Sequence, residues 1–242
     1  MMALLIAAAV ALPSPSDLRT VPRLVQTAQP VDCAGSRGHS FALTFDDGPS
    51  PFTLHLVRVL RRARARATFF EVGSRVGVWP AGARAASRAG ELANHTWSHA
   101  NLAALSPVAA WRELVWTQRA VGRTTGTAPR LFRPPYASAR PVDDLLGREL
   151  GLLDVRWSVD GGDARVGANA AATIHAVVKG LGPGSIVLLH DLHPWTPAVT
   201  RAVLRAARRK GLRAVTVSEL LARQPPSARQ LGSEGAARCP VR

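Results

Sequence analysis

From residue 41 onward, short apolar runs alternate with segments of helical spacing, and this alternation limits the fold more than any other feature. Strand-like runs occupy residues 41–45, 67–72, 90–93, 131–133, 152–157, 185–189 and 214–217. Between them, segments 53–66, 107–121, 168–181 and 197–210 place apolar residues on one helix face. Strands that alternate with helices pair in parallel through right-handed crossovers. We expect an α/β fold, with an incomplete TIM-like (β/α)7 barrel as first choice and an open doubly wound sheet as second.

The chain is expected to form one domain over residues 31–223, because no internal repeat or linker interrupts residues 41–223. Residues 224–242 are rich in Pro, Ser, Gly and Arg and are predicted to form a flexible tail. The apolar run 3–12 has signal-peptide length, although no Lys or Arg precedes it. We therefore assign residues 1–30 to a signal peptide or N-terminal extension.

Composition narrows the class of protein further. Hydrophobic residues make up 47% of the 242 residues, so the chain can bury a substantial core. The net charge of +15 favours an acidic neighbourhood, such as an anionic cell envelope. Nucleic acid is disfavoured, because Arg residues are scattered along many helices and no basic run is interleaved with aromatic residues. Nothing indicates a stable partner protein, and we expect a monomer.

Cys33 and Cys239 are the only cysteines, and neither belongs to a CxxC spacing. Two free buried thiols are one reading. The other, which we favour, is a disulfide that ties together the two ends of a secreted domain, and it requires an oxidising compartment. We therefore expect a secreted or cell-envelope location.

Polar residues follow most of the predicted strands. They are, in chain order, Asp46-Asp47, His95, the segment 133–136, Asp160 with Asp163, and His190-Asp191. The carboxyl ends of parallel strands meet at one edge of a sheet and at one mouth of a barrel. We expect these residues to converge there.

Asp46, Asp47, His95 and His99 include the ligands of an open metal site, with one carboxylate to spare. A catalytic zinc has three protein ligands and leaves a position for water, on which a spare carboxylate can act as a base. Adjacent side chains of an extended strand diverge, so one Asp can bind metal while the other faces the water. If residues 95–99 are helical, both imidazoles project from one face. The alternatives are a polar turn that caps the next helix, and two solvated histidines.

His190 ends the apolar run 185–189. A lone His at such a place is often a core residue, but beside Asp160 or Asp163 it becomes a candidate general acid, since a carboxylate raises the pKa of an imidazole.

Arg133 precedes Pro134 and Pro135. Its rigid fork could pair with a carboxylate of the site. Proline has no N–H, so the first free N–H belongs to Tyr136, where it is placed to stabilise an oxyanion. A surface turn is the alternative.

The motifs at residues 44–49, 95–99, 133–136, 157–163 and 188–191, in that order, resemble the polysaccharide deacetylase family, the NodB homology domain of carbohydrate esterase family 4. The resemblance covers about residues 40–222. It implies a distorted (β/α) barrel that holds one divalent metal ion, usually Zn2+, with Co2+, Mn2+ or Ni2+ as alternatives. It also implies hydrolysis of N-acetyl groups from a chitin-like or peptidoglycan-like glycan.

The resemblance implies a role for single residues within these motifs. They are Asp47, His95 and His99 as metal ligands, Asp46 as general base, Arg133 as the group that orients it, the Tyr136 N–H as oxyanion donor, His190 as general acid, Asp163 as its partner, and Leu188 as a wall of the acetyl pocket.

Two positions depart from the family pattern. Ala164 follows Asp163 where the family usually has Trp, and Ala137 stands where Gly is common. A Trp from elsewhere could line the groove instead, and of Trp97, Trp157 and Trp195 we assign Trp157 to the substrate pocket.

Three functions compete. A polysaccharide N-deacetylase leads, followed by an O-acetyl esterase on xylan-type glycans, and then by an inactive homologue that only binds carbohydrate. The complete set of candidate catalytic residues argues against the last.

Overall fold

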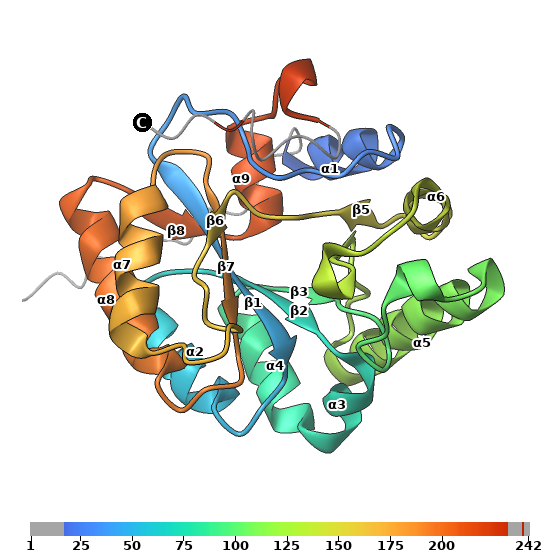
Figure 1. Ribbon diagram of the computed structural model, residues 1–242, viewed down its shortest axis with the longest axis horizontal. Coiled ribbons are helices and arrows are strands. Elements are labelled where there is room, and N and C mark those ends of the chain that lie inside the picture. Colours follow the sequence, from blue (N-terminus) through green and yellow to red (C-terminus); the bar gives the residue numbers. More distant parts are fainter. Residues whose placement is uncertain (1–16, 232–238, 240–242) are drawn as a thin grey trace, which may run out of the picture.

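The apolar runs form a parallel sheet that curls into a half-barrel with helices outside it, as Figure 1 shows for the computed structural model. The structure describes residues 17–231 and Cys239. Within them the strands are β1 (Ser40–Gly48), β2 (Thr68–Glu71), β3 (Glu91–Asn94), β4 (Leu131–Phe132), β5 (Leu153–Asp154), β6 (Val159–Asp160), β7 (Ile186–His190) and β8 (Arg213–Val215). Their order is β5-β4-β3-β2-β1-β7-β6, and β8 pairs with the start of β1. The expected distorted, incomplete TIM-like (β/α)7 barrel is confirmed.

The helices are α1 (Asp17–Val25), α2 (Thr53–Ala63), α3 (Gly73–Val78), α4 (Pro80–Ala89), α5 (Pro107–Thr125), α6 (Pro141–Glu149), α7 (Ala170–Gly180), α8 (Thr196–Arg209) and α9 (Val217–Arg223). Most of them lie between the strands in the chain, whereas α1 precedes β1 and α9 follows β8. The four predicted helices correspond to α2, α5, α7 and α8. No described helix combines the length and the apolar character that a membrane span requires.

The barrel is open between β5 and β6. The sequence predicts one strand over residues 152–157, but the chain pairs with β4 only at Leu153–Asp154 and joins β7 at Val159–Asp160. The backbone between these strands turns away, with Val155 in a parallel bridge to Val31. The strand predicted over residues 152–157 is therefore shorter than expected, and residues 159–160, just beyond that run, form the strand at the other edge of the opening.

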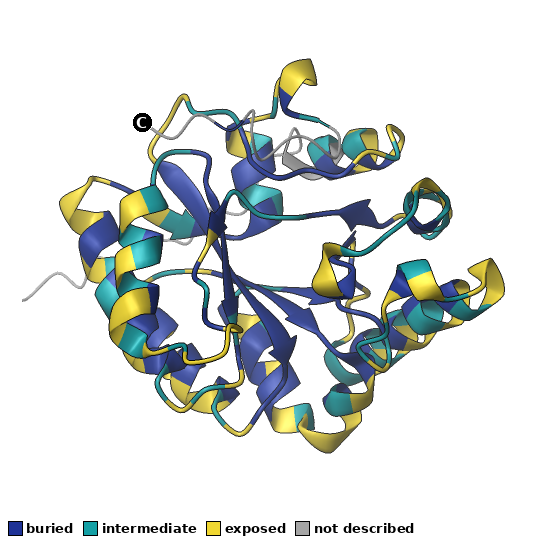
Figure 2. Ribbon diagram, viewed as in Figure 1, coloured by how far each residue is buried: buried dark blue, intermediate teal, exposed yellow. Residues whose placement is uncertain are grey.

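Alternation along β1 separates the two sides of the sheet. Phe41, Leu43 and Phe45 belong to the apolar core under the outer helices, so the intervening residues face the barrel interior. β7 alternates in the same way, and its register sets Leu188 beside Thr44 and His190 beside Asp46. Figure 2 shows the resulting pattern of buried strands inside exposed helix surfaces.

Two helices close the amino end of the barrel. Val21 and Val25 of α1 and Leu220 of α9 pack into the interior core that includes Ile186 of β7. We expected residues 1–30 to lie outside the folded domain, whereas residues 17–25 form α1 and contribute to this core. The predicted signal peptide or extension falls mainly on residues 1–16, which lie outside the described residues.

The start of the predicted tail is anchored. Gln224 accepts from the Ser40 N–H at 3.1 Å and donates to the Gly35 carbonyl at 2.6 Å, and Gln230 donates to the Ala34 carbonyl at 3.1 Å. Residues 224–230 are therefore not a free tail; residues 232–238 and 240–242 lie outside the described part. Cys33 and Cys239 form a disulfide, which is the arrangement we favoured from the sequence.

Candidate active site

Three side chains at the carboxyl end of the sheet converge on one point. The Asp47 Oδ1 atom lies 3.0 Å from His99 Nε2 and 3.4 Å from His95 Nε2. One ligand atom from each of the three residues lies within 4.8 Å of the others. Around a tetrahedral Zn2+ with ligand bonds near 2.0–2.1 Å, ligand atoms stand about 3.3 Å apart. The spacing therefore fits a metal of this kind.

Hydrogen bonding fixes the tautomer of His95. Its Nδ1–H donates to the Arg133 carbonyl at 2.7 Å, and a carbonyl can only accept. When the imidazole is neutral, the lone pair is therefore on Nε2, the atom that faces Asp47. A ring held in this way by its other nitrogen is typical of metal-binding histidines.

The chemistry of the donor set also fits a cation. Among the described residues, no group meets the buried Asp47 Oδ1 atom with hydrogen-bond geometry. Burial alone would raise the pKa of Asp47, but the adjacent imidazoles of His95 and His99 outweigh it and hold that pKa well below its ordinary value. A buried carboxylate that stays ionised beside two imidazole nitrogens is a suitable ligand for a divalent metal.

The loop that carries the histidines is not a helix, so the helical arrangement considered for residues 95–99 was wrong. Thr96 and His99 have φ values of 63° and 61°, and their left-handed backbone turns both imidazoles toward Asp47. Side chains brace this loop: Asn94 accepts from the Thr96 N–H at 2.9 Å, and Glu113 of α5 accepts from the Ser98 N–H at 2.8 Å.

The side chains of Asp46 and Asp47 point in different directions, and alternation along a strand is only part of the reason. Asp47 has a φ of 69°, and the register with β2 shifts between Asp46 and Gly48. Arg75 of α3 donates to the Asp47 carbonyl at 2.7 Å and holds this bend. At Gly48, an added Cβ would lie 2.6 Å from the Glu71 carboxylate, so a larger residue in the turn after the two Asp residues would displace the Glu71 side chain.

Asp46 faces the barrel interior, where Arg133 holds it. The Arg133 Nη1 atom donates to Asp46 Oδ1 at 2.6 Å and to Thr44 Oγ1 at 2.9 Å. The rest of the guanidinium donates to the carbonyls of Val155 and Arg156, each at 2.8 Å, which lie in the opening between β5 and β6. Arg133 is completely buried and donates to four acceptors, so Asp46 Oδ1 is fixed while Oδ2 lies 3.8 Å from His95 Nε2.

On the opposite side of the site, His190 pairs with Asp163. The Nδ1–H of His190 donates to Asp163 Oδ1, and its backbone N–H donates to Asp163 Oδ2, both at 2.8 Å. Burial lowers the pKa of His190, but the Asp163 hydrogen bond and the charges of Asp46, Asp163 and Asp47 raise it to about 9. Asp160 instead pairs with Arg165 at 2.9 Å, so Asp163 is the carboxylate that contacts His190.

Tyr136 follows the two prolines with a φ of 61°. The residue is 70% exposed, and its ring stands edge-on to that of His99, with 5.0 Å between the ring centroids. In the part of the chain that the structure describes, no backbone carbonyl accepts from its N–H. Ala137 has a φ of 53°, which explains why glycine suits that position in the family pattern.

These residues surround a pocket of about 410 Å3. Leu188 and Trp157 form part of its wall, together with Ala164 at the position where the family usually has Trp. Of the three tryptophans considered from the sequence, Trp157 alone lines this pocket; Trp97 stands edge-on to Trp116, and Trp195 stacks on His193. Arg133 and Asp163 lie behind the pocket wall, where they hold Asp46 and His190.

Sequence reasoning missed several supporting residues. Besides Arg75, the carboxylate of Asp191 accepts from the hydroxyls of Ser50 and Thr53, and its N–H donates to the Asp46 carbonyl at 2.9 Å. Asp191 therefore ties the end of β7 to the turn after β1. Its position directly after His190 was visible in the sequence, but its partners were not.

Comparison with known proteins gives the same family as the motifs. Residues 35–153 match the family model described as polysaccharide deacetylase. The chain is 36% identical over 181 residues to a peptidoglycan-N-acetylglucosamine deacetylase of Listeria monocytogenes. The matched region is 74% of this chain and 38% of that protein. It is 38% identical over 167 residues to a chitooligosaccharide deacetylase of Bradyrhizobium, and the matched region is 67% of this chain and 74% of that protein.

A solved structure agrees in fold. The family 4 carbohydrate esterase of Streptomyces lividans, solved in complex with acetate, aligns with a TM-score of 0.69 and 34% identity over 73% of this chain and 92% of that one. The chain belongs to the polysaccharide deacetylase family, carbohydrate esterase family 4. It spans only 38% of the length of the Listeria enzyme.

Proposed function

We propose that this protein is a metal-dependent hydrolase that removes N-acetyl groups from a peptidoglycan-like or chitin-like glycan. One observation carries the proposal: a candidate metal triad, the Asp46 carboxylate held by Arg133 and the His190 imidazole paired with Asp163 line the same pocket. The relatives are named as peptidoglycan and chitooligosaccharide deacetylases, which supports the choice of substrate.

Asp47, His95 and His99 would hold the metal, with Zn2+ as the first candidate. When bound there, a divalent metal supplies Lewis acidity that polarises the acetyl carbonyl and makes water more acidic.

The chain's own residues provide the proton transfers. Asp46, held by Arg133, accepts the proton that the attacking water loses. The Tyr136 N–H donates to the developing oxyanion. His190 protonates the leaving nitrogen, a step that an amide needs because a neutral amine leaves far more readily than an amide anion. Asp163 keeps His190 protonated for this purpose.

Leu188 and Trp157 give the pocket an apolar wall, where the acetyl methyl group would lie. We place the protein outside the cytoplasm, since its disulfide suits an oxidising compartment and its relatives act on cell-wall glycan.

The test is acetate release from N-acetyl chitooligosaccharides, peptidoglycan and acetylated xylan, with chelator and after Zn2+ is restored. We expect release from an N-acetylated glycan that chelator abolishes and Zn2+ recovers. Release from acetylated xylan alone would replace the proposal with an ester hydrolase, and tight glycan binding without any acetate would replace it with an inactive carbohydrate-binding protein.

A further inference from the structure

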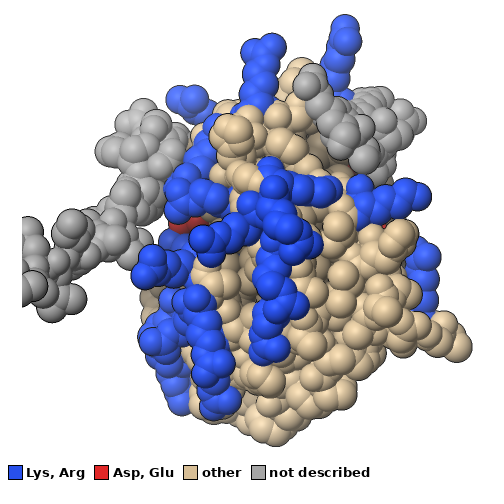
Figure 3. Space-filling model, turned by 90° about the vertical axis from the view of Figure 1, so that its left-hand side faces the viewer, with Lys and Arg blue, Asp and Glu red and all other residues tan. Residues whose placement is uncertain are grey.

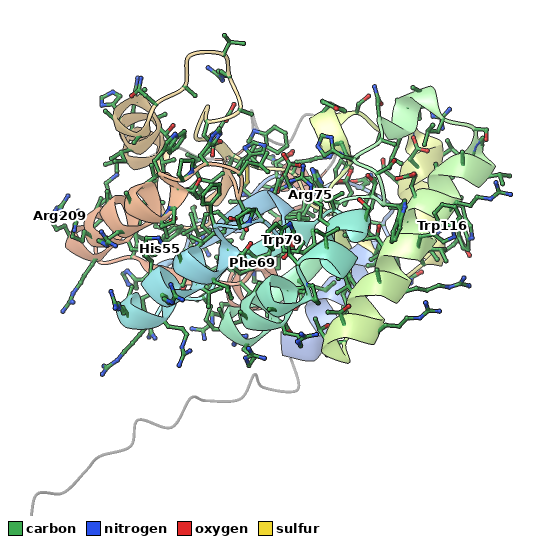
Figure 4. The ribbon with its side chains drawn as sticks, turned by 90° about the horizontal axis from the view of Figure 1, so that it is seen from below. His55, Phe69, Arg75, Trp79, Trp116 and Arg209 are labelled. Atoms are coloured by element: carbon green, nitrogen blue, oxygen red, sulfur yellow. A yellow bond between two sulfur atoms is a disulfide. The ribbon has the colours of Figure 1, made fainter. Side chains whose placement is uncertain are left out.

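The outer face on the side of α7 and α8 is strongly basic. Figure 3 shows Lys and Arg side chains over much of this face and almost no acidic ones. The sequence explains the asymmetry, because neither residues 53–66, which include α2, nor residues 196–213, which include α8, contain an Asp or Glu. In Figure 4, Arg209 projects outward from α8.

The charge is concentrated along a groove. α2 packs against α8, and a hollow of about 550 Å3 runs along their carboxyl-terminal halves. Its floor is apolar and includes Val59, Leu204 and Leu212. We call it the arginine groove after the exposed side chains that line it, which are Arg62, Arg64, Arg201, Arg205, Arg208 and Arg213.

These arginines are unpaired within the described residues. Elsewhere on the surface Arg66 pairs with Glu219 at 2.6 Å and Arg165 with Asp160 at 2.9 Å, but no described carboxylate lies within ion-pair distance of the groove arginines. Their mutual repulsion is therefore not offset inside the molecule, and an external polyanion would offset it. Arg201, Arg205 and Arg208 succeed one another by about one helical turn, ~5.4 Å, a spacing that suits a ligand with repeated charges.

We propose that the arginine groove binds a linear phosphodiester polymer that carries no bases, such as a polyol phosphate of the cell envelope. Arginines stand on both rims, from the α2 side and from α8. A phosphodiester lies within the polymer backbone, and its two free oxygens project to opposite sides of that backbone, so the polymer can meet guanidinium groups on both rims; a carboxylate is a side group and reaches one rim at a time.

Other polyanions fit the groove less well. No aromatic side chain lines it to stack on nucleobases, as single-stranded nucleic acid would require. A lipid bilayer cannot enter a groove, and none of the large exposed apolar side chains of the described residues lines it to insert into lipid.

The groove lies away from the candidate active site. It borders Arg213 and Ala214 at the start of β8, beside the start of β1, whereas Asp46 and His190 stand where β1 and β7 end. A polymer held there leaves the pocket open, so it would retain the protein in an anionic matrix while the pocket acts on glycan.

Fluorescence anisotropy with labelled poly(glycerol phosphate) at ~0.15 M salt tests the proposal. The groove variant combines Arg62→Gln, Arg201→Gln, Arg205→Gln and Arg208→Gln. A matched control removes four exposed charges from α4 and α5, with Arg84→Gln, Arg88→Gln, Arg112→Gln and Arg119→Gln. Thermal unfolding and acetate release from a short chitooligosaccharide verify that both variants fold.

We expect the groove variant to bind about 10- to 100-fold more weakly and the control within about twofold of the wild type. The slope of log K against log salt concentration should decrease by about three in the groove variant, because four contacts at ~0.7 each are lost. Equal losses in both variants, or no binding by the wild type, would overturn the proposal. Tighter binding of single-stranded DNA or of anionic phosphatidylglycerol vesicles through the same arginines would overturn the choice of ligand.

Discussion

The candidate active site and the arginine groove both depend on charge, but they hold it in opposite ways. Around the site, Arg133 is buried and donates to four acceptors, and Asp163 is buried against His190. In the groove, arginines such as Arg205 are exposed and have no acidic partner among the described residues. A buried, paired charge fixes geometry, whereas an exposed, unpaired one can only attract a ligand.

The largest expected effect is on catalysis. Asp46→Asn should reduce acetate release about a thousandfold, since the amide cannot accept the proton from water. Asp160→Asn is the matched control, because Asp160 lines the same pocket but is exposed and pairs with Arg165; its activity should stay within a few fold. Equal losses in the two variants would remove Asp46 from the role of base.

The next largest effect is expected on the free energy of unfolding when a buried arginine is replaced. Arg133→Met should lower the free energy of unfolding by about 3–5 kcal/mol, because Asp46 then stays buried without its partner. Arg205→Met should change it by no more than about 0.5 kcal/mol. Urea denaturation of both variants measures the difference, and similar values would mean that the two arginines do not differ as the structure indicates.

A smaller effect is expected on the pKa of His190. In metal-free protein, His190 should titrate near pH 9, and Asp163→Asn should move its pKa down toward 6.5. The raised pKa stabilises the fold fully below pH 6.5, and this stabilisation is lost as pH rises through about 9. NMR of the imidazole carbons measures both; an unchanged pKa in Asp163→Asn would show that the pair does not tune His190.

Much of the fold and of the site could be predicted from the sequence, because apolar alternation and residue order are local signals. The runs at residues 41–45 and 185–189 gave β1 and β7, and their carboxyl ends brought Asp46 and His190 together. The pairing of Cys33 with Cys239 was favoured because they are the only two cysteines and lie near opposite ends of the chain, not because of any local pattern.

What could not be predicted depends on tertiary packing. The left-handed backbone at Asp47, Thr96 and His99 has no signature in those residue types, and it replaces the helix considered for residues 95–99. α1 contains a proline and follows the leader-like run 3–12 in the sequence, so its packing against α9 was not predicted. The strands at the two edges of the open barrel, β5 and β6, have two residues each, which is too short for apolar periodicity to reveal.

Metal content of two variants tests the central claim most directly. After each protein is loaded with Zn2+ and desalted, elemental analysis should find about one ion per chain in the wild type and in Asp46→Asn, and almost none in His95→Ala. Asp46→Asn would then be inactive with metal bound, and His95→Ala inactive without it. Equal metal content in the two variants would contradict a site in which Asp47, His95 and His99 hold the ion and Asp46 remains free to accept a proton.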